Sequence, residues 1–139
     1  NQNEPVSTIM TRSVITANVS DNLRQVNSLM KKNNVRHMPV VSGTKLVGIV
    51  SRTDIMRLSF GDMFDDHTSA DGTVFDTLTL EQVMMNNPRT VDENTSIKEV
   101  AEIFSKEEFH ALPVMNNGDV TGIISTTDLM KYLLKLMNG

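Results

Sequence analysis

The chain contains no cysteine among its 139 residues. That absence excludes disulfides, thiolate zinc sites and cysteine nucleophiles together, and it fits a reducing compartment such as the cytoplasm. Basic residues are in the minority: 13 Lys and Arg against 17 Asp and Glu give a formal net charge of −4, which argues against duplex nucleic acid as a partner. No apolar run approaches the roughly 20 residues of a membrane span, and no basic-then-apolar signal opens the chain. We therefore expect a cytoplasmic globular protein without a membrane segment.

Patterns typical of catalysis and metal binding are equally scarce. No Ser-His-Asp signature, Walker loop or paired-carboxylate motif stands out. The acidic stretch 62–72 faintly resembles a calcium loop, but the spacing fails because position 69 is Ser and the closing Glu is missing. The three histidines are not spaced as metal ligands: His37, His67 and His110. The sequence therefore predicts neither an enzyme nor a metal site.

What the chain does contain is an internal repeat at a constant spacing of 74 residues. The segment Gly48-Ile-Val-Ser-Arg-Thr-Asp54 returns as Gly122-Ile-Ile-Ser-Thr-Thr-Asp128. No gap is needed between residues 10–58 and 84–132. An ungapped repeat of this length predicts two copies of one small domain, packed as a pseudo-symmetric pair.

Each copy carries the same order of predicted elements. Apolar residues at helical spacing follow a cap at Ser20 in the first copy and at Asn94 in the second. A hairpin of two short apolar strands comes next, and a last helix begins at Ser51 or Ser125. The order strand, helix, hairpin, helix, repeated once, predicts an α+β fold in which each small sheet has two flanking helices. The predicted hairpin strands are 38–41, 46–50, 112–115 and 120–124.

The boundaries follow from the same repeat. Thr79 with Gln82 predicts a capping box for a short helix that leads into the second copy. An exposed linker with one helical patch at 74–78 is expected before it. The predicted divisions are copy 1 at 1–58, an insert or linker at 59–79 and copy 2 at 80–139. Because the chain begins with Asn1 rather than Met, we also expect that an upstream segment is missing from it.

The segment ending in Asp54 is the strongest candidate for binding chemistry. It lies where a buried strand turns into a helix, a position at which backbone N–H groups lack partners and the helix dipole favours an anion. Ser51 or Thr53 could donate to a phosphate, and the Asp54 carboxylate suits the paired hydroxyls of a ribose. Gly48 would keep the strand bare where a flat ring approaches. The alternative is a plain helix cap, since Ser-x-x-Asp is also typical of that role.

Taken together, these residues resemble the CBS domain pair, or Bateman module. The resemblance rests on motifs that occur twice in the same order and covers nearly the whole chain except the insert. It implies binding of AMP, ADP, ATP or S-adenosylmethionine, and regulation of an attached domain or partner protein. It also implies a disc-like homodimer. The matching motifs are the two Pro-Val strand starts (Pro39-Val40 and Pro113-Val114), the Leu-Val-Gly-Ile-Val run and the two Gly-x-x-Ser-x-x-Asp endings.

The resemblance further implies two composite clefts, each combining the ending of one copy with residues of the other. In such clefts Arg36, Arg89 and His110 are candidates for phosphate charge, whereas Val35 and Phe109 would form a wall of an adenine pocket or simply belong to the core. One cleft would use Ser51, Thr53 and Asp54 with Pro88, Arg89, Phe109 and His110. The other would use Ser125, Thr127 and Asp128 with Val14, Ile15, Val35 and Arg36.

Three functions follow as hypotheses from these observations. The favoured one is a regulatory adenine-nucleotide sensor that signals through a conformational or dimer change. The alternative is a ligand-free dimerisation or scaffold module, in which the Ser-x-x-Asp segments only cap helices. An enzyme is disfavoured because no nucleophile–base pair or metal set is found. The insert at 59–79 suggests no function.

Overall fold

The computed structural model describes residues 3–12, 14–64 and 76–139, with residues 59–64 described by their backbone alone. The chain divides into two compact units. Unit 1 combines Asn1–Val14 with Pro88–Gly139, and unit 2 is the continuous stretch Ile15–Asn87. Each unit has one small sheet with helices, so the predicted α+β class is confirmed.

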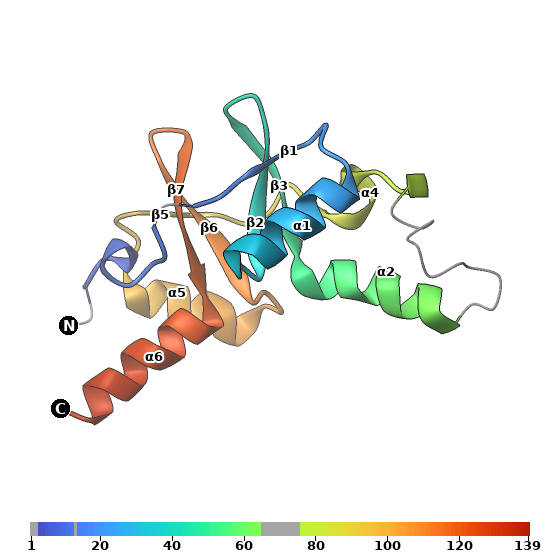
Figure 1. The fold of residues 1–139 in the computed structure, drawn as a ribbon. Coiled ribbons are helices and arrows are strands. Elements are labelled where there is room, and N and C mark those ends of the chain that lie inside the picture. Colours follow the sequence, from blue (N-terminus) through green and yellow to red (C-terminus); the bar gives the residue numbers. More distant parts are fainter. Residues whose placement is uncertain (1–2, 13, 65–75) are drawn as a thin grey trace. The chain divides into compact units, whose positions relative to one another are not determined.

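Unit 2 contains the hairpin of the first copy and a four-stranded sheet in the order β1-β2-β3-β4 (Figure 1). Strand β1 runs parallel to β2, and the other two pairings are antiparallel. Buried side chains from the helices and from the sheet form one core, which includes Leu23, Met38 and Ile55. The elements are β1 (Ala17–Asn18), α1 (Leu23–Asn33), β2 (His37–Ser42), β3 (Lys45–Ser51), α2 (Arg52–Phe64), α4 (Leu80–Val83) and β4 (Met85–Asn86).

Unit 1 repeats this plan around the second hairpin, with a three-stranded sheet in the order β5-β6-β7 (Figure 1). Thr11 adds an antiparallel bridge to Ile123 of β7, at the position where β4 lies in unit 2. Val100, Leu112 and Ile124 are among the residues that form its separate core. The elements are the 3-10 helix η1 (Val6–Thr8), β5 (Val91–Asp92), α5 (Ile97–Lys106), β6 (Ala111–Asn116), β7 (Asp119–Ser125) and α6 (Thr126–Met137).

The two hairpins have the same register. His37 faces Ser51 in unit 2, and Ala111 faces Ser125 in unit 1, with a bulge at the same place in both. The second turn uses Asn117 and Gly118 at φ 52° and 86°, a left-handed conformation that these two residue types tolerate well. All four predicted hairpin strands are present, and each is one residue longer at both ends than predicted.

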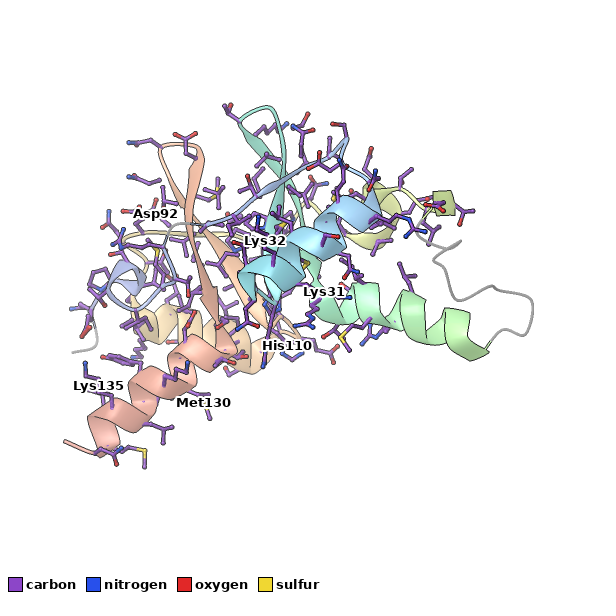
Figure 2. The ribbon with its side chains drawn as sticks, in the orientation of Figure 1. Lys31, Lys32, Asp92, His110, Met130 and Lys135 are labelled. Atoms are coloured by element: carbon purple, nitrogen blue, oxygen red, sulfur yellow. The ribbon has the colours of Figure 1, made fainter. Side chains whose placement is uncertain are left out.

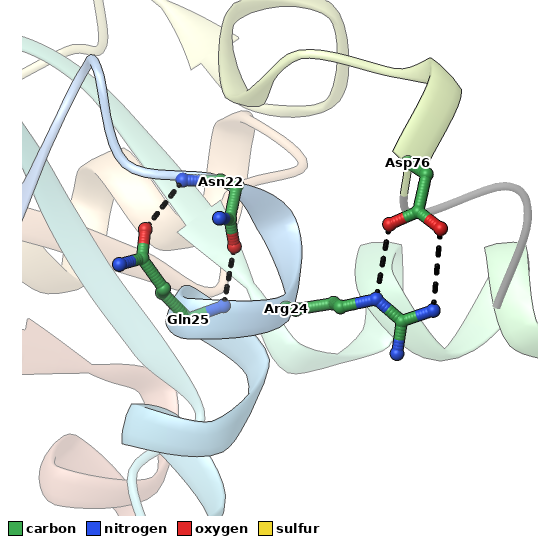
Figure 3. Close-up of polar contacts among 4 residues, drawn as sticks. All are labelled: Asn22, Arg24, Gln25 and Asp76. Atoms are coloured by element: carbon green, nitrogen blue, oxygen red, sulfur yellow. Dashed lines mark hydrogen bonds and ion pairs between the residues drawn. The ribbon is translucent and has the colours of Figure 1, made fainter.

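The predicted starts of helices α1 and α5 are wrong by two residues. The cap of α1 is Asn22, whose Oδ1 accepts from the Gln25 N–H at 2.8 Å, while Gln25 Oε1 accepts from the Asn22 N–H at 2.9 Å (Figure 3). The cap of α5 is Ser96 rather than Asn94, and its Oγ accepts from the Glu99 N–H. Ser20 instead donates its hydroxyl to the Asn18 side chain in the turn before α1.

Part of the predicted linker at 59–79 is helical. Helix α2 continues to Phe64, and Leu78 packs against the core of unit 2. The predicted helical patch at 74–78 lies partly outside the described residues, while the capping box of Thr79 and Gln82 is confirmed at the start of α4. Asp76 accepts two bonds from Arg24 of α1, the shorter at 3.0 Å (Figure 3). The predicted divisions at 1–58, 59–79 and 80–139 stay a prediction about sequence copies.

The compact units do not coincide with the sequence copies. The leading segment of the first copy, residues 1–14, belongs to unit 1 together with the body of the second copy. In the same way, residues 80–87 lead into the second copy but belong to unit 2. Each unit therefore joins the body of one copy to the leading segment of the other.

Candidate functional site

The Ser51 corner is the point in unit 2 where β3 ends and α2 begins. Ser51 Oγ accepts from the Asp54 N–H at 3.0 Å, which fixes the start of the helix. The Asp54 carboxylate pairs with Arg57, Oδ1 to Nη1, at 3.4 Å. Ser51 and Asp54 are half-buried, and Thr53 between them is exposed. The corner thus offers a hydroxyl and a carboxylate at an accessible helix start.

The Ser125 corner is its counterpart in unit 1, at the junction of β7 and α6. Ser125 Oγ accepts from the Asp128 N–H at 3.0 Å, and Asp128 Oδ2 accepts from the Ser125 N–H at 3.1 Å. This reciprocal pair is a complete capping box. Thr11 donates a further, longer bond to the same Oδ2 at 3.4 Å. Thr127 is exposed, as Thr53 is.

The residue before each hairpin lies next to the corner of its own copy. The Arg52 N–H donates to the Arg36 carbonyl at 2.8 Å, and the Thr126 N–H donates to the His110 carbonyl at 3.0 Å. The side chains of Arg36 and His110 are both exposed; His110 is labelled in Figure 2. Two residues predicted as phosphate contacts are therefore held by their backbone beside a corner.

The remaining predicted site residues fall into two groups. Ile15 and Val35 pack against the core of unit 2, and Phe109 against the core of unit 1, all of them half-buried. Val14 and Pro88 are half-buried as well. The predicted combination of each corner with residues of the other copy stays a prediction.

Arg89 is engaged within unit 1. Its Nη1 donates to both carboxylate oxygens of Glu107, at 3.0 and 3.3 Å. Arg89 also borders an open pocket of about 350 Å³. Ser125, Thr127 and Asp128 are not among the residues that line this pocket. Its other lining residues are Thr90, Val91, Asp92, Thr95, Glu99, Ile103 and Met115. Arg89 thus makes an exposed ion pair in this structure, and its predicted contact with a phosphate stays a prediction.

The proposed role of Gly48 is wrong. A side chain at Gly48 would overlap the sulfur of Met84, and one at Gly122 would overlap the sulfur of Met10. Both methionines are buried and lie in the leading segments described above. The bare strand therefore receives a packed thioether within its own unit, not a flat ring.

Sequence reasoning missed three residues at these corners. Arg57 is three residues after Asp54 on the same helix, a spacing that places their side chains side by side and could have indicated the pair. Thr11 reaches Asp128 from far along the sequence, and no local pattern indicates that contact. Arg52 stands where the second copy has Thr126, and its Nε is buried without a partner among the described residues.

Two further absences hold for the described ranges. No group of three or more His, Cys, Asp or Glu side chains there is arranged to hold a metal ion. Nor does any helix within those ranges combine the length and the apolar character needed to cross a bilayer.

Comparison with known proteins places this arrangement in a family. The family model described as CBS domain matches residues 6–61 and 80–135. The chain therefore belongs to the CBS domain family, as a tandem CBS pair.

Relatives and solved structures agree with that assignment. The uncharacterized protein MJ1225 of Methanocaldococcus jannaschii is 34% identical over 134 residues, which cover 94% of this chain and 48% of that protein. The crystal structure of MJ1225 matches with a TM-score of 0.77 at 31% identity, over 96% of this chain and 49% of that one. The CBS domain pair of protein MJ0100, in complex with 5'-methylthioadenosine and S-adenosyl-L-methionine, matches with a TM-score of 0.79 at 25% identity, over 95% and 97%.

A pair of this kind also occurs inside larger proteins. An inosine-5'-monophosphate dehydrogenase of Korarchaeum cryptofilum is 26% identical over 85% of this chain, which spans only 22% of that enzyme. This chain spans about half of MJ1225. CBS pair proteins are generally regulatory modules rather than catalysts, and some CBS pairs are parts of larger enzymes.

Proposed function

We propose that this CBS pair is a regulatory module that binds an adenosyl ligand at its strand-to-helix corners. Binding would change conformation or dimer packing and so control an attached domain or a partner protein. The observation that carries the proposal is the corner built twice, with Ser Oγ bonded to the Asp N–H and an exposed Thr between them in both copies. A pair of the same fold, that of MJ0100, is bound to two adenosyl compounds.

The chemistry of each corner suits a ribose and a phosphate. Two of the first three helix amides are already engaged, by the carbonyl before the hairpin and by the Ser hydroxyl. This leaves the amide and hydroxyl of Thr53 or Thr127 to meet an anion at the positive end of the helix dipole. The Asp carboxylates accept from ribose hydroxyls, Asp128 by giving up its long bond from Thr11.

The energetics require more than these polar contacts. Micromolar affinity corresponds to about −8 kcal/mol, whereas a helix start with a few hydroxyl contacts contributes roughly 1–3 kcal/mol. Burial of the adenine ring must supply most of the rest. Half-buried apolar residues such as Val35 and Phe109 are the proposed wall for that ring.

Calorimetric titration with AMP, ADP, ATP and S-adenosylmethionine tests the proposal. We expect at least one of them to bind, and the double variant Asp54→Ala with Asp128→Ala to bind it at least about tenfold more weakly, since the ribose loses its acceptors. Arg24→Ala, which removes an exposed ion pair at the start of α1, is the matched control and should bind as the original chain does. If none of the four compounds gives heat or a thermal shift, the sensor function is rejected.

A ligand-free dimerisation module is the second candidate, because two observations favour it. The Asp128 carboxylate closes a capping box, as that alternative requires. Helix α6 also leaves a row of large apolar side chains exposed, among them Met130 (Figure 2), Leu133 and Leu134. A second copy of this chain is the proposed occupant of that row, as the family resemblance implies. Sedimentation velocity should show a dimer, and Leu134→Asp should shift it toward monomer; a monomeric original chain would exclude this role.

A further inference from the structure

The carboxylate of Asp128 already accepts hydrogen bonds from two parts of unit 1. Its Oδ2 accepts from the Ser125 N–H at 3.1 Å and from the Thr11 hydroxyl at 3.4 Å. An ionised carboxylate has about two acceptor positions on each oxygen, so these two donors fill Oδ2. The other oxygen, Oδ1, accepts no bond from any residue that the structure describes. Asp128 therefore has one oxygen left for a ligand.

The carboxylate of Asp54 is open on both oxygens. Its Oδ1 pairs with Arg57 at 3.4 Å, and the Arg57 side chain is 76% exposed, so water can replace that pair at little cost. Its Oδ2 has no partner within the described ranges. Asp54 also makes no return bond to the Ser51 N–H, in contrast to Asp128. The two acids differ in the acceptor sites that they can offer.

The difference originates in the leading segments. Thr11 exchanges backbone hydrogen bonds with Ile123 of β7, at 2.8 and 3.0 Å, and this pairing holds its hydroxyl next to Asp128. Met85 stands 74 positions later in the sequence and faces Ile49 of β3 in the same register. A methionine side chain has no donor, whereas a threonine hydroxyl has one. Unit 2 thus lacks a counterpart of the Thr11 bond.

A ribose tests this difference because it presents two neighbouring hydroxyls. A carboxylate receives both best when each hydroxyl donates to its own oxygen. At Asp128 the second hydroxyl can reach Oδ2 only after one of the present donors has left. Thr11 is the donor that leaves, since its bond is the longer one and its side chain is exposed to water. The Ser125 N–H bond belongs to the capping box of α6 and stays.

We propose that Thr11 lowers the ribose affinity of the Ser125 corner, by occupying the Asp128 oxygen that a ribose hydroxyl needs. The Ser51 corner, where Met85 replaces Thr11, carries no such restraint and is the stronger ribose site of the two. This inference rests on the proposed function, because it takes the Asp carboxylates as the acceptors of the ribose hydroxyls. Thr11 acts as a specificity-determining residue: it tunes one corner without changing the motif.

The test measures the Ser125 corner alone, by calorimetry in an Asp54→Ala background. The two probes are AMP and 2′,3′-dideoxyadenosine monophosphate, which keeps the base and the phosphate but lacks both ribose hydroxyls. We expect Thr11→Val to strengthen AMP binding about two- to fivefold, the equivalent of one exposed hydrogen bond that no longer has to be broken. The affinity for the dideoxy compound should not change. Valine keeps the backbone pairing with Ile123 and suits an extended segment.

Three controls assign the effect to the hydroxyl and to Asp128. Thr11→Ser keeps a hydroxyl at this place and should bind both probes as the background does. Thr8→Val removes a hydroxyl of the same leading segment, one that donates to Glu4 at 3.0 Å, and should change neither affinity. In an Asp128→Ala background, where the Ser51 corner alone is measured, Thr11→Val should have no effect on AMP.

The outcomes separate this inference from the proposed function. If the original chain binds AMP but Thr11→Val leaves the ratio of AMP to dideoxy affinity unchanged, the role of Thr11 is rejected and the sensor function stands. An equal gain for both probes also rejects it, because the effect then does not pass through the ribose hydroxyls. If the Asp54→Ala background binds no AMP, binding that appears with Thr11→Val supports the inference, and continued absence overturns it. If the original chain binds no adenosyl compound, the proposed function fails and this inference fails with it. Should Thr11→Val not fold, Thr11→Ala also removes the hydroxyl and is judged by the same ratio.

Discussion

The Ser51 and Ser125 corners share a backbone and differ in what their carboxylates do. At both, a Ser hydroxyl accepts from an Asp N–H, and the first helix amide donates to the carbonyl before the hairpin. Asp128 then turns back to the Ser125 N–H and receives Thr11, while Asp54 pairs outward with Arg57. Helix capping and the proposed ligand binding can therefore fall to different residues of one motif. The Ser caps the helix in both copies, whereas the Asp side chain takes part in the cap only in unit 1.

The largest effect is expected from the core of each unit. Met38 and Leu112 are equivalent hairpin residues with 0% and 1% exposure. Truncation of either to Ala should lower the free energy of unfolding by about 2–5 kcal/mol, because each leaves a cavity beside a strand that ends at a corner. Urea unfolding measures the loss. If only Leu112→Ala lowered the free energy of unfolding, the two cores would not contribute equally to stability.

Filling the bare strand should cost somewhat less. Gly48→Val forces the buried Met84 thioether aside, and we expect a loss of about 1–3 kcal/mol from overpacking. Adding Met84→Ala to Gly48→Val should recover part of that loss, because the shorter alanine leaves room for the valine side chain. Gly122→Val with Met10→Ala is the matched pair in unit 1. Thermal unfolding of the four variants checks the expectation, and no recovery in either double variant would contradict it.

Removing the acids should then distinguish the corners. Asp128→Ala loses the return bond of the capping box, and we expect a cost of about 1 kcal/mol. Asp54→Ala should cost less, since Arg57 is 76% exposed and an ion pair so open to solvent contributes little. Chemical denaturation of the two single variants gives both values. Equal costs would mean that the second corner's capping box adds no stability.

The smallest expected effect concerns the exposed ion pair of Arg24 and Asp76 in unit 2. The hydrogen bond from Arg24 lowers the pKa of Asp76 below its ordinary value of 3.8. A carboxyl with a lowered pKa stabilises the folded state above its ordinary pKa, and this contribution is lost as the pH falls through the folded value. Asp76→Asn should therefore melt slightly below the original chain at pH 7. The melting temperatures of the two proteins should converge as the pH falls below the folded pKa of Asp76, and a gap that is independent of pH would exclude this cause.

Local signals predicted the elements better than their exact starts. Pairs of apolar runs around the turns at 42–45 and 116–119 predicted the two hairpins, and Ser51 and Ser125 were correctly placed at helix starts. The caps of α1 and α5 were misplaced because Ser20 and Asn22, or Asn94 and Ser96, are all good capping residues. Packing of the helix on its sheet selects between them, and that choice is not encoded in a single residue type.

The repeat itself concealed the exchange of leading segments. Met10 and Met84 are separated by 74 residues, as are Gly48 and Gly122, so pairing within a copy and pairing between copies fit the pattern equally. The structure pairs Met10 with Gly122 and Met84 with Gly48. An ungapped repeat therefore indicates which kinds of residue are in contact, but it does not indicate which copy supplies each partner. The assignment of His110 to the Ser51 corner and of Arg36 to the Ser125 corner stays a prediction for the same reason.

The division of the chain has a practical consequence for dissection. Unit 2 is one uninterrupted polypeptide, Ile15–Asn87, inserted into unit 1 between Val14 and Pro88. Two cuts release unit 2 as one continuous fragment, whereas unit 1 needs its two pieces rejoined by a new peptide bond. If the gene were split between the two copies instead, each half would lose a sheet partner. A first half that stops short of Met85 lacks β4, which pairs with β3, and the second half lacks Thr11, which pairs with β7. Expression boundaries for half-molecules should follow the spatial units, not the duplicated sequence.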